Sequence, residues 1–467
     1  MIDWINQYVF GVAVPLLLMG VGLFYCVRLR FFHLLRPRAI WQALTEREAG
    51  SGVSSFRALT LALAGTLGVG NIVGVSAAIA MGGFGAIFWM WVSALCAMLL
   101  KYAEIVLAMR HRRFDDSGKP HGAAMYYIRD FFTGLGCKRL GMAVAAVFAL
   151  LCVLNAVSMG SVIQVNAIAK AFDGVFGVSP IVTGVMLALL TLIVTRKGTE
   201  GMVGVTGKLV PLMTLGYLIL SAAVLILRAD RIPEAFGQIL HDAFSVESAA
   251  GGIGGFFLSA ALRYGTMRGV ISNEAGVGTA PAAHAVSRCT QPAKQGVWGI
   301  FEVFTDTILL CTVTALAVIV SWPEVVAREG DFMMMTITAY SAVLGEFAAV
   351  FMALAVLLFG FATVICWAHY GLESVRYLSD RSMVSRLFLL LYVTSVPFGA
   401  FASSDIIWQT ADFAVGAMTL INVTVLCFMS REVKNETDLW LGTVNKWERA
   451  GRLGKRRELR WKVTKRP

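Results

Sequence analysis

The chain has 467 residues, of which 57% are hydrophobic and only 15% are charged, and its formal net charge is +11. A soluble core cannot absorb that much apolar surface, so the composition excludes an ordinary water-soluble domain. The positive charge could suggest a nucleic-acid partner, but the basic residues gather in loops on one side of a predicted membrane. That placement argues against nucleic acid.

Apolar stretches long enough to cross a bilayer recur from end to end of the chain. A spanning helix needs about 20 mostly apolar residues, because only a helix satisfies its own backbone polar groups in hydrocarbon. The first stretch has no basic segment or cleavage site before it, so we expect a retained helix rather than a signal peptide. The sequence therefore predicts an all-α polytopic membrane protein with about eleven spanning helices, at residues 9–27, 58–81, 85–109, 141–168, 180–195, 208–227, 252–285, 297–320, 346–370, 387–403 and 406–429.

Lysine and arginine mark one side of this predicted membrane protein. They concentrate in the loops after helices 1, 3, 5, 7 and 9 and in the tail, whereas the opposite side holds only Lys170, Arg228, Arg231 and Arg328. Because basic residues favour the cytoplasmic side, we expect an outside amino terminus and an inside tail in a bacterial-type inner (plasma) membrane. Residues 446–466 would suit a segment lying on anionic lipid, and a disordered basic tail is the alternative.

Two predicted helices are interrupted by glycines in matching places. Helix 58–81 contains AGTLGVGNIVGV, and helix 252–285 contains RGVISNEAGVGTAP. They lie five helices apart and so cross in opposite directions, which is the pattern of a transporter's central site. Unwound backbone offers carbonyls to a cation, and the new half-helix amino termini offer N–H groups to a carboxylate. The alternative is close helix packing through small residues.

Three motifs carry a resemblance to a known family: GVGNIVGVSAAIAMGGFGAIFWMWV at 68–92, SNEAGVGTAPAAHA at 272–285 and QGVWGIFEVFTDTILLCTVTAL at 295–316. Together they resemble the alanine or glycine:cation symporter family, over about residues 56–371. The resemblance implies a leucine-transporter-like core of five plus five inverted helices, with one extra N-terminal helix. The implied parts are an extra helix and cytoplasmic loop (1–55), the first repeat (56–227), the second repeat (228–430) and a basic cytoplasmic tail (431–467).

The resemblance also implies a site, in which the two breaks cradle the substrate backbone and Trp367 closes over its side chain. The implied substrate-binding residues are Gly68, Gly70, Asn71, Gln164, Asn166, Ser272, Asn273, Gly276 and Trp367. The implied sodium ligands, mostly through backbone carbonyls, are Thr66, Leu67, Gly70 and Thr363. The sequence reads GGFG where the family has proline after the second glycine, so Phe84 should alter an external turn but not the substrate.

Ionisable residues within predicted spans need a partner or a cavity. Glu302 and Asp306 are four residues apart and share a helix face. A structural charge network is the preferred interpretation of these carboxylates and Glu274, and a proton relay is the alternative. The expected pairings are Glu302 and Asp306 with Arg263 and Arg268, and Lys101 with Glu104.

These features predict a secondary active symporter that couples inward sodium movement to uptake of a small neutral amino acid, alanine or glycine, by alternating access. The chain has no HExxH motif, nucleophile elbow or phosphate-binding loop, so an enzyme is not expected. Proton coupling, a preference for glutamine or serine, a non-transporting sensor and a channel are the alternatives. We expect no cofactor other than sodium as the coupling ion. The expected partners are the amino acid, sodium and the lipid bilayer, and a monomer should suffice for function.

Overall fold

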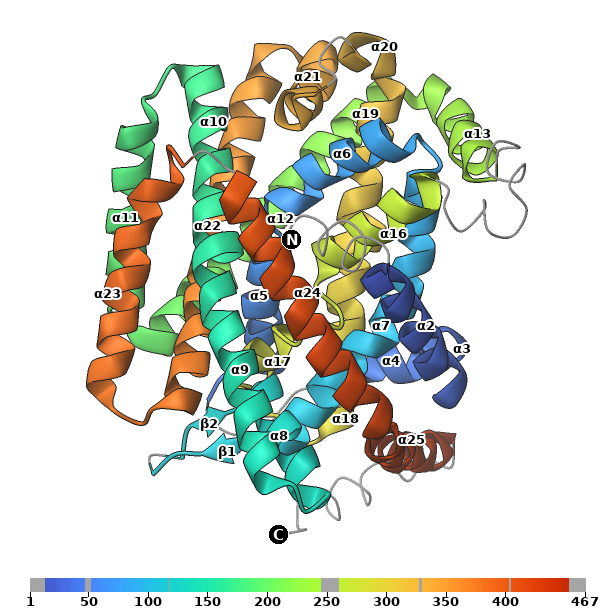
Figure 1. The fold of residues 1–467 in the computed structure, drawn as a ribbon. Helices are drawn as coiled ribbons and strands as arrows, with labels where there is room; N and C mark the ends of the chain where they lie inside the picture. Colours follow the sequence, from blue (N-terminus) through green and yellow to red (C-terminus); the bar gives the residue numbers. More distant parts are fainter. Residues whose placement is uncertain are drawn as a thin grey trace.

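Helices make up almost all of the computed structural model (Figure 1), which describes residues 13–46, 52–116, 118–244, 260–326, 330–402 and 405–452. The α-helices are α2 (Val14–Arg28), α3 (Phe32–Leu35), α4 (Pro37–Thr45), α5 (Ser55–Thr66), α6 (Val73–Gly82), α7 (Ala86–His111), α8 (Ala124–Gly134), α9 (Lys138–Val157), α10 (Gln164–Phe176), α11 (Pro180–Thr195), α12 (Gly198–Leu227), α13 (Ile232–Ala243), α16 (Ala260–Asn273), α17 (Ala280–His284), α18 (Pro292–Val303), α19 (Thr312–Val320), α20 (Trp322–Val325), α21 (Phe332–Leu344), α22 (Glu346–Leu378), α23 (Ser382–Gly399), α24 (Asp405–Phe428) and α25 (Ser430–Arg452). Shorter elements are the 3-10 helices η2 (Val69–Asn71) and η4 (Ala229–Arg231), the π-helical segments η3 (Ser158–Ile163) and η5 (Phe304–Cys311), and the antiparallel strands β1 (Arg113–Phe114) and β2 (Pro120–His121).

The helices follow the predicted apolar stretches. Seven described helical segments are long and apolar enough to cross a membrane, at 86–111, 138–176, 198–227, 292–320, 346–378, 382–399 and 409–428. The shorter apolar helices include α2, α6 and α11, which lie in the remaining predicted stretches. Parts of the predicted spans 9–27, 252–285 and 387–403 fall outside the described residues. The expected all-α polytopic architecture is confirmed.

Helices outside the predicted spans cover the two ends of the bundle. Figure 1 places α8, β1, β2 and α25 at one end and α13, α20 and α21 at the other. The first end carries the basic loops, so under the predicted orientation it is the cytoplasmic end.

The described part of the tail is the helix α25, and most of residues 446–466, for which a lipid-bound or disordered segment was predicted, lies outside the described residues. α25 continues the chain to Arg452 as a helix, with Val433, Thr437, Trp440 and Val444 buried at a spacing of three to four residues. This apolar stripe packs α25 on α7 and α18, which is why the segment is helical despite its charge. The rest of the tail lies outside the described residues.

The broken helices lie in the middle of the bundle. α16 and α18 pack on α7, and α22 packs on α5, α9, α10 and α12. The first break is therefore held between α22 and the α7–α16 pair, which fixes where its backbone polar groups point.

Candidate substrate and ion site

The first helix break falls where the sequence predicted it. α5 ends at Thr66, the Gly68 backbone is extended (φ −103°, ψ −159°), and α6 begins only at Val73. The intervening residues form the single turn η2. The first turn of α6 thus presents N–H groups that have no partner within the helix.

The second break follows α16 and is sharper. Glu274, Gly276 and Gly278 all have left-handed backbone angles, with φ of 53°, 87° and 88°, before α17 begins at Ala280. A side chain at φ above zero is strained, so glycine suits two of these positions and Glu274 is a non-glycine exception. Both predicted interruptions are therefore real breaks.

A cavity of about 690 Å³ lies against both breaks. Its walls come from α2, α5, α6, the η3–α10 junction, α16, α22 and α24. It continues outward to Lys170, Gly330 and Asp331, which are exposed at the end of the bundle that carries α21. The cavity is thus open toward the predicted external side. Its lining includes eight of the predicted site residues: Thr66, Gly68, Gly70, Gln164, Asn166, Ser272, Thr363 and Trp367.

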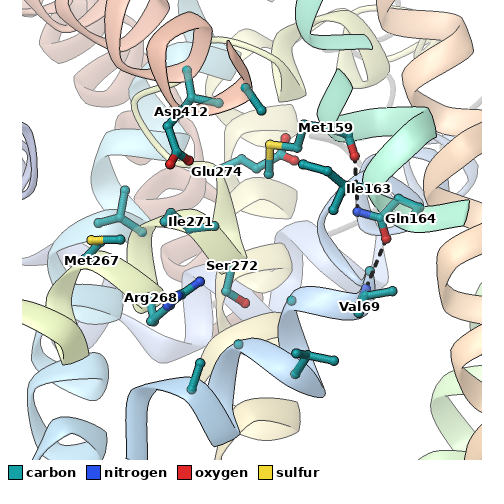
Figure 2. A pocket seen from close by; sticks show the side chains of 18 of the residues that line it. Val69, Met159, Ile163, Gln164, Met267, Arg268, Ile271, Ser272, Glu274 and Asp412 are labelled. Atoms are coloured by element: carbon teal, nitrogen blue, oxygen red, sulfur yellow. Dashed lines mark hydrogen bonds between the residues drawn. The ribbon is translucent and has the colours of Figure 1, made fainter. Parts of the chain in front are cut away.

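Gln164 ties α10 to the first break. Its Oε1 accepts a hydrogen bond from the Val69 backbone N–H at 3.2 Å, and its Nε2 donates to the Met159 carbonyl at 3.3 Å (Figure 2). The preceding turns, η3, are π-helical, a distortion often found at functional sites. The amide is satisfied on both ends, so Gln164 holds the unwound segment in place at the cavity wall.

The predicted ion ligands lie where the first break meets α22. A Cβ atom added to Gly68 would stand 2.8 Å from Thr363 Oγ1 and 3.1 Å from Gln164 Oε1. Thr66 Oγ1 is buried and has no hydrogen-bond partner among the described residues. Leu67 is buried as well and does not line the cavity. Oxygen atoms therefore converge on Gly68, and only glycine leaves room for them.

Trp367 borders the cavity from α22. Its side chain is fully buried, with its ring 5.3 Å from that of Tyr370. Gly160 in η3 packs so closely on it that a Cβ there would lie 2.2 Å from Trp367 Cβ. The indole is thus held rigidly at the cavity wall.

Three predicted site residues have their side chains bonded elsewhere, and a fourth, Gly276, does not line the cavity. Asn166 touches the cavity, but its amide donates to the Gly399 and Ala402 carbonyls. Asn273 donates to Thr307 Oγ1 and accepts from the Ala275 N–H. Asn71, Asn273 and Gly276 are all absent from the cavity wall: Asn71 bonds to Asp306, and Gly276 packs on Leu18 and Leu100.

The buried charges pair differently from the sequence prediction. Lys101 Nζ lies 3.1 Å from Glu302, which also contacts His284 at 3.0 Å. Glu104 instead accepts a hydrogen bond from the Asn422 amide, so the predicted Lys101–Glu104 pair is wrong. These partners are on different helices, which residue spacing along one helix cannot reveal.

Neither predicted arginine pairs with the carboxylates of α18 and η5. Arg268 lines the cavity and is attracted electrostatically by the carboxylate of Asp412 in α24. No described carboxylate oxygen lies within 4 Å of the Arg268 guanidinium. The expected pairings with Glu302 and Asp306 are therefore wrong.

The predicted site did not include the charged cavity residues Arg268, Glu274 and Asp412. Figure 2 shows Glu274, Arg268 and Asp412 among its lining side chains. Glu274 Oε2 accepts a hydrogen bond from Thr279 Oγ1 at 2.6 Å. The position of Glu274 inside the second glycine-rich break could have identified it from the sequence. Arg268 and Asp412 offered no indication beyond being charged residues within predicted spans.

Comparison with known proteins decides the family. The model of the sodium:alanine symporter family matches residues 1–451. The chain belongs to the sodium:alanine symporter family. It is 35% identical over 442 residues to the sodium/alanine symporter AgcS of Methanococcus maripaludis, covering 94% of this chain and 96% of the relative. It is 34% identical to the amino-acid carrier protein AlsT of Bacillus subtilis, over 92% and 88% of the two chains. The chain is accordingly a multi-pass membrane transporter and not an enzyme.

Solved structures confirm the leucine-transporter-like fold. A sodium-coupled sialic acid symporter superposes with a TM-score of 0.57 at 13% identity, over 90% of this chain and 87% of that one. MhsT in complex with L-phenylalanine superposes with a TM-score of 0.51 at 15% identity, over 84% and 93%. At such identities the likeness concerns the fold alone.

Proposed function

We propose that this chain couples sodium entry to the uptake of a small neutral amino acid, with alanine or glycine as the substrate. The observation that carries the proposal is the single cavity that meets both helix breaks. An amino acid is a zwitterion, and broken helices offer N–H groups to its carboxylate beside carbonyls that suit a cation. Family membership and the relatives named for alanine support the same conclusion.

The substrate carboxylate is placed at the first turn of α6, beside Gly68 and Gly70, and Gln164 fixes that turn. Sodium is placed at the carbonyls of residues 66–70 with Thr363. Because the cation and the carboxylate would be neighbours, each would strengthen the binding of the other, and transport would depend on the sodium gradient.

The walls around the first break favour a small side chain. Gln164 is bonded at both ends, and Trp367 is packed against Gly160, so neither can move away without cost. The cavity also reaches the exposed residues Lys170 and Asp331. An amino acid with a bulky side chain would overlap these rigid groups.

Sodium-driven uptake is tested with purified protein in proteoliposomes and labelled alanine. An inward sodium gradient should cause accumulation, and a matched potassium gradient should not. If a proton gradient drives uptake and a sodium gradient does not, protons are the coupling ion. Competition by glycine, serine and glutamine then ranks the substrates. Glutamine is included because the chain is 29% identical to the "probable sodium/glutamine symporter GlnT" of Bacillus subtilis.

A matched pair of variants tests the site. Gly70 lines the cavity and a Cβ there would meet nothing within 4 Å, so the side chain in Gly70→Leu would occupy the cavity. Gly204 in α12 is equally open but faces outward, so Gly204→Leu is the control. Uptake should be lost in the first variant and kept in the second, at equal amounts of folded protein. Normal uptake by Gly70→Leu would refute the placement of the substrate.

A further inference from the structure

The chain turns sharply where the helix α2 ends. Two hydrogen bonds close this turn, from the Arg30 N–H to the Val27 carbonyl at 3.0 Å and from the Phe31 N–H to the Cys26 carbonyl at 2.7 Å. This pair of bonds is the Schellman motif, in which glycine usually takes the left-handed position. Here Arg30 takes it, with a φ of 56°, and Phe31 follows with a φ of 47°. Such angles strain a residue that has a side chain, so the turn alone does not account for an arginine at this position.

The turn opens a basic surface that we call the arginine corner, residues 28–41. Its four arginines lie at positions 28, 30, 36 and 38, and the sequence has no Asp or Glu before residue 46 in this stretch. Arg30, Arg36 and Arg38 are exposed, and none of them forms an ion pair with a described residue. Arg36 donates one hydrogen bond to Asn445 Oδ1 of α25 at 3.0 Å, which leaves its other N–H groups for a ligand. The corner therefore carries positive charge that no carboxylate of the described protein neutralises.

Exposed apolar side chains stand among these arginines. Leu34 is 51% exposed, Leu35 is 72% exposed and Trp41 is 70% exposed. All three follow the end of the predicted span 9–27, so they lie at the boundary of the membrane and not within its hydrocarbon core. An indole prefers that boundary, and basic residues there are attracted to anionic headgroups. Cations beside apolar side chains suit the level at which headgroups meet acyl chains.

The arginine corner is built on a fixed support. The ring of Phe32 in α3 packs edge-to-face on Tyr102 of α7, at 5.1 Å between centroids, and on Trp440 of α25 at 6.1 Å. Ala39 and Ala43 give α4 a buried face, which packs against α18. Figure 1 places α2, α3 and α4 together at one side of the bundle, next to the end that carries α25. The exposed side chains therefore project from a surface whose backbone is held in place.

We propose that the arginine corner binds the headgroup of an anionic phospholipid in the predicted cytoplasmic leaflet. Arg30, Arg36 and Arg38 hold the phosphate, because a guanidinium group donates two parallel hydrogen bonds to phosphate oxygens. Trp41 and the two exposed leucines contact the glycerol and the first part of the acyl chains. A zwitterionic lipid binds more weakly, since its own ammonium group offsets the phosphate charge. A soluble phosphate has no acyl chain to cover the apolar side chains.

The helix α2 connects this lipid to the cavity. Val14, Pro15 and Leu18 of α2 line the cavity, and the same helix packs on α7, α16 and α24. A lipid held at the arginine corner therefore acts on one wall of the cavity from outside the site. Because a ligand shifts an equilibrium toward the conformation that binds it better, transport depends on the lipid as well as on the gradient. This inference goes beyond the proposed function and holds whatever amino acid is carried.

Direct binding of lipid tests the proposal. The full chain, purified in a neutral detergent, is titrated with phosphatidylglycerol or phosphatidylcholine, and native mass spectrometry counts the bound lipid. One basic residue near an anionic surface contributes about fivefold in affinity, so the triple variant Arg30→Gln, Arg36→Gln, Arg38→Gln should bind phosphatidylglycerol about 100-fold more weakly. The matched control removes the same charge from exposed arginines of other predicted cytoplasmic loops, as Arg139→Gln, Arg381→Gln, Arg386→Gln. The control should keep its affinity within twofold of wild type.

The variant Arg30→Gly separates the lipid contact from the turn. Glycine relieves the left-handed backbone, so the melting temperature without lipid should not fall. The affinity for phosphatidylglycerol should nevertheless fall about fivefold. In proteoliposomes, sodium-driven alanine uptake by wild type should be faster with phosphatidylglycerol than in phosphatidylcholine alone, and the triple variant should lose this difference.

Three results overturn the inference. The first is equal affinity of wild type for the two lipids, which needs no variant to fold. The second is a folded triple variant, or a folded Arg30→Gly protein, that binds phosphatidylglycerol as tightly as wild type. The third is displacement of the lipid by an equal concentration of inorganic phosphate, which would assign the surface to a free anion. Absence of uptake under every gradient would instead count against the proposed function, and the lipid titration would still judge the arginine corner.

Discussion

Adding a single methyl group at Gly68 should weaken the binding of substrate or sodium at the first break and leave the rest of the fold intact. In Gly68→Ala the new Cβ would stand 2.8 Å from Thr363 Oγ1, closer than real Cβ atoms come to any neighbour, and 3.1 Å from Gln164 Oε1. Thr363 Oγ1 is held by its hydrogen bond to the Phe359 carbonyl at 3.1 Å. Gln164 is held by Val69 and Met159. Both neighbouring side-chain atoms are held by hydrogen bonds, so the backbone of the break must shift to relieve the overlap.

The expected size of this effect follows from overpacking, which costs about 1–3 kcal/mol. At about 1.4 kcal/mol per tenfold, the apparent KM for alanine or sodium should rise by about 5-fold to 150-fold. Uptake into proteoliposomes at varied alanine and varied sodium measures it. Gly204→Ala is the matched control, since a Cβ there meets nothing within 4 Å. A Gly68→Ala protein with both KM values within twofold of wild type would refute the reasoning.

Three further variants probe other parts of the molecule. Lys101→Met should lower the free energy of unfolding by about 3–5 kcal/mol because it leaves Glu302 buried without its lysine, and Lys101→Met with Glu302→Gln should recover part of the loss; equal melting temperatures for the single and double variants would contradict this. Trp367→Phe should improve competition by larger amino acids against alanine about tenfold, as measured by inhibition of labelled uptake, because the wall recedes; an unchanged ranking would remove Trp367 from the pocket. The hydrogen bond from His121 to Glu373 raises the pKa of His121, so its stabilisation should be full below about pH 6.5 and fade as pH rises through the higher folded value. The melting temperatures of wild type and His121→Gln should accordingly converge at alkaline pH, and a constant difference would argue against the pairing.

Helix positions and helix breaks were predictable because each depends on local sequence. A run of about 20 apolar residues in hydrocarbon forms a spanning helix, because only a helix satisfies its own backbone polar groups there. Clustered glycines beside a polar residue mark the point at which such a helix is interrupted. The glycines at 68, 276 and 278 fall in non-helical backbone, as expected. The amphipathic α25 was missed because its charge outweighed its apolar stripe in the composition.

The charge pairings could not be predicted, because they depend on which helices meet. Lys101 and Glu104 are one turn apart, yet Lys101 contacts Glu302 and Glu104 contacts Asn422. The same limit applies to Asp306, whose partners Asn71 and Ser272 come from two other helices. Sequence spacing identified the polar residues that needed partners but not the partners themselves.

A buried polar network on the side away from the cavity mouth explains how the fold favours the conformation that is open toward the predicted external side. Beneath the second break, His284 of α17 bonds to Glu302 at 3.0 Å and to Gln295 at 2.9 Å. Ser55 of α5 donates to the same Gln295, so both inner half-helices are tied to α18. Opening toward the predicted cytoplasm must separate these buried polar groups, and each unpaired group is costly until water reaches it. Ion and substrate binding at the breaks lies one helical segment away from these bonds. Alternating access would then consist of exchanging this inner polar network for closure around Arg268 and Asp412, which both line the cavity without forming a salt bridge to each other.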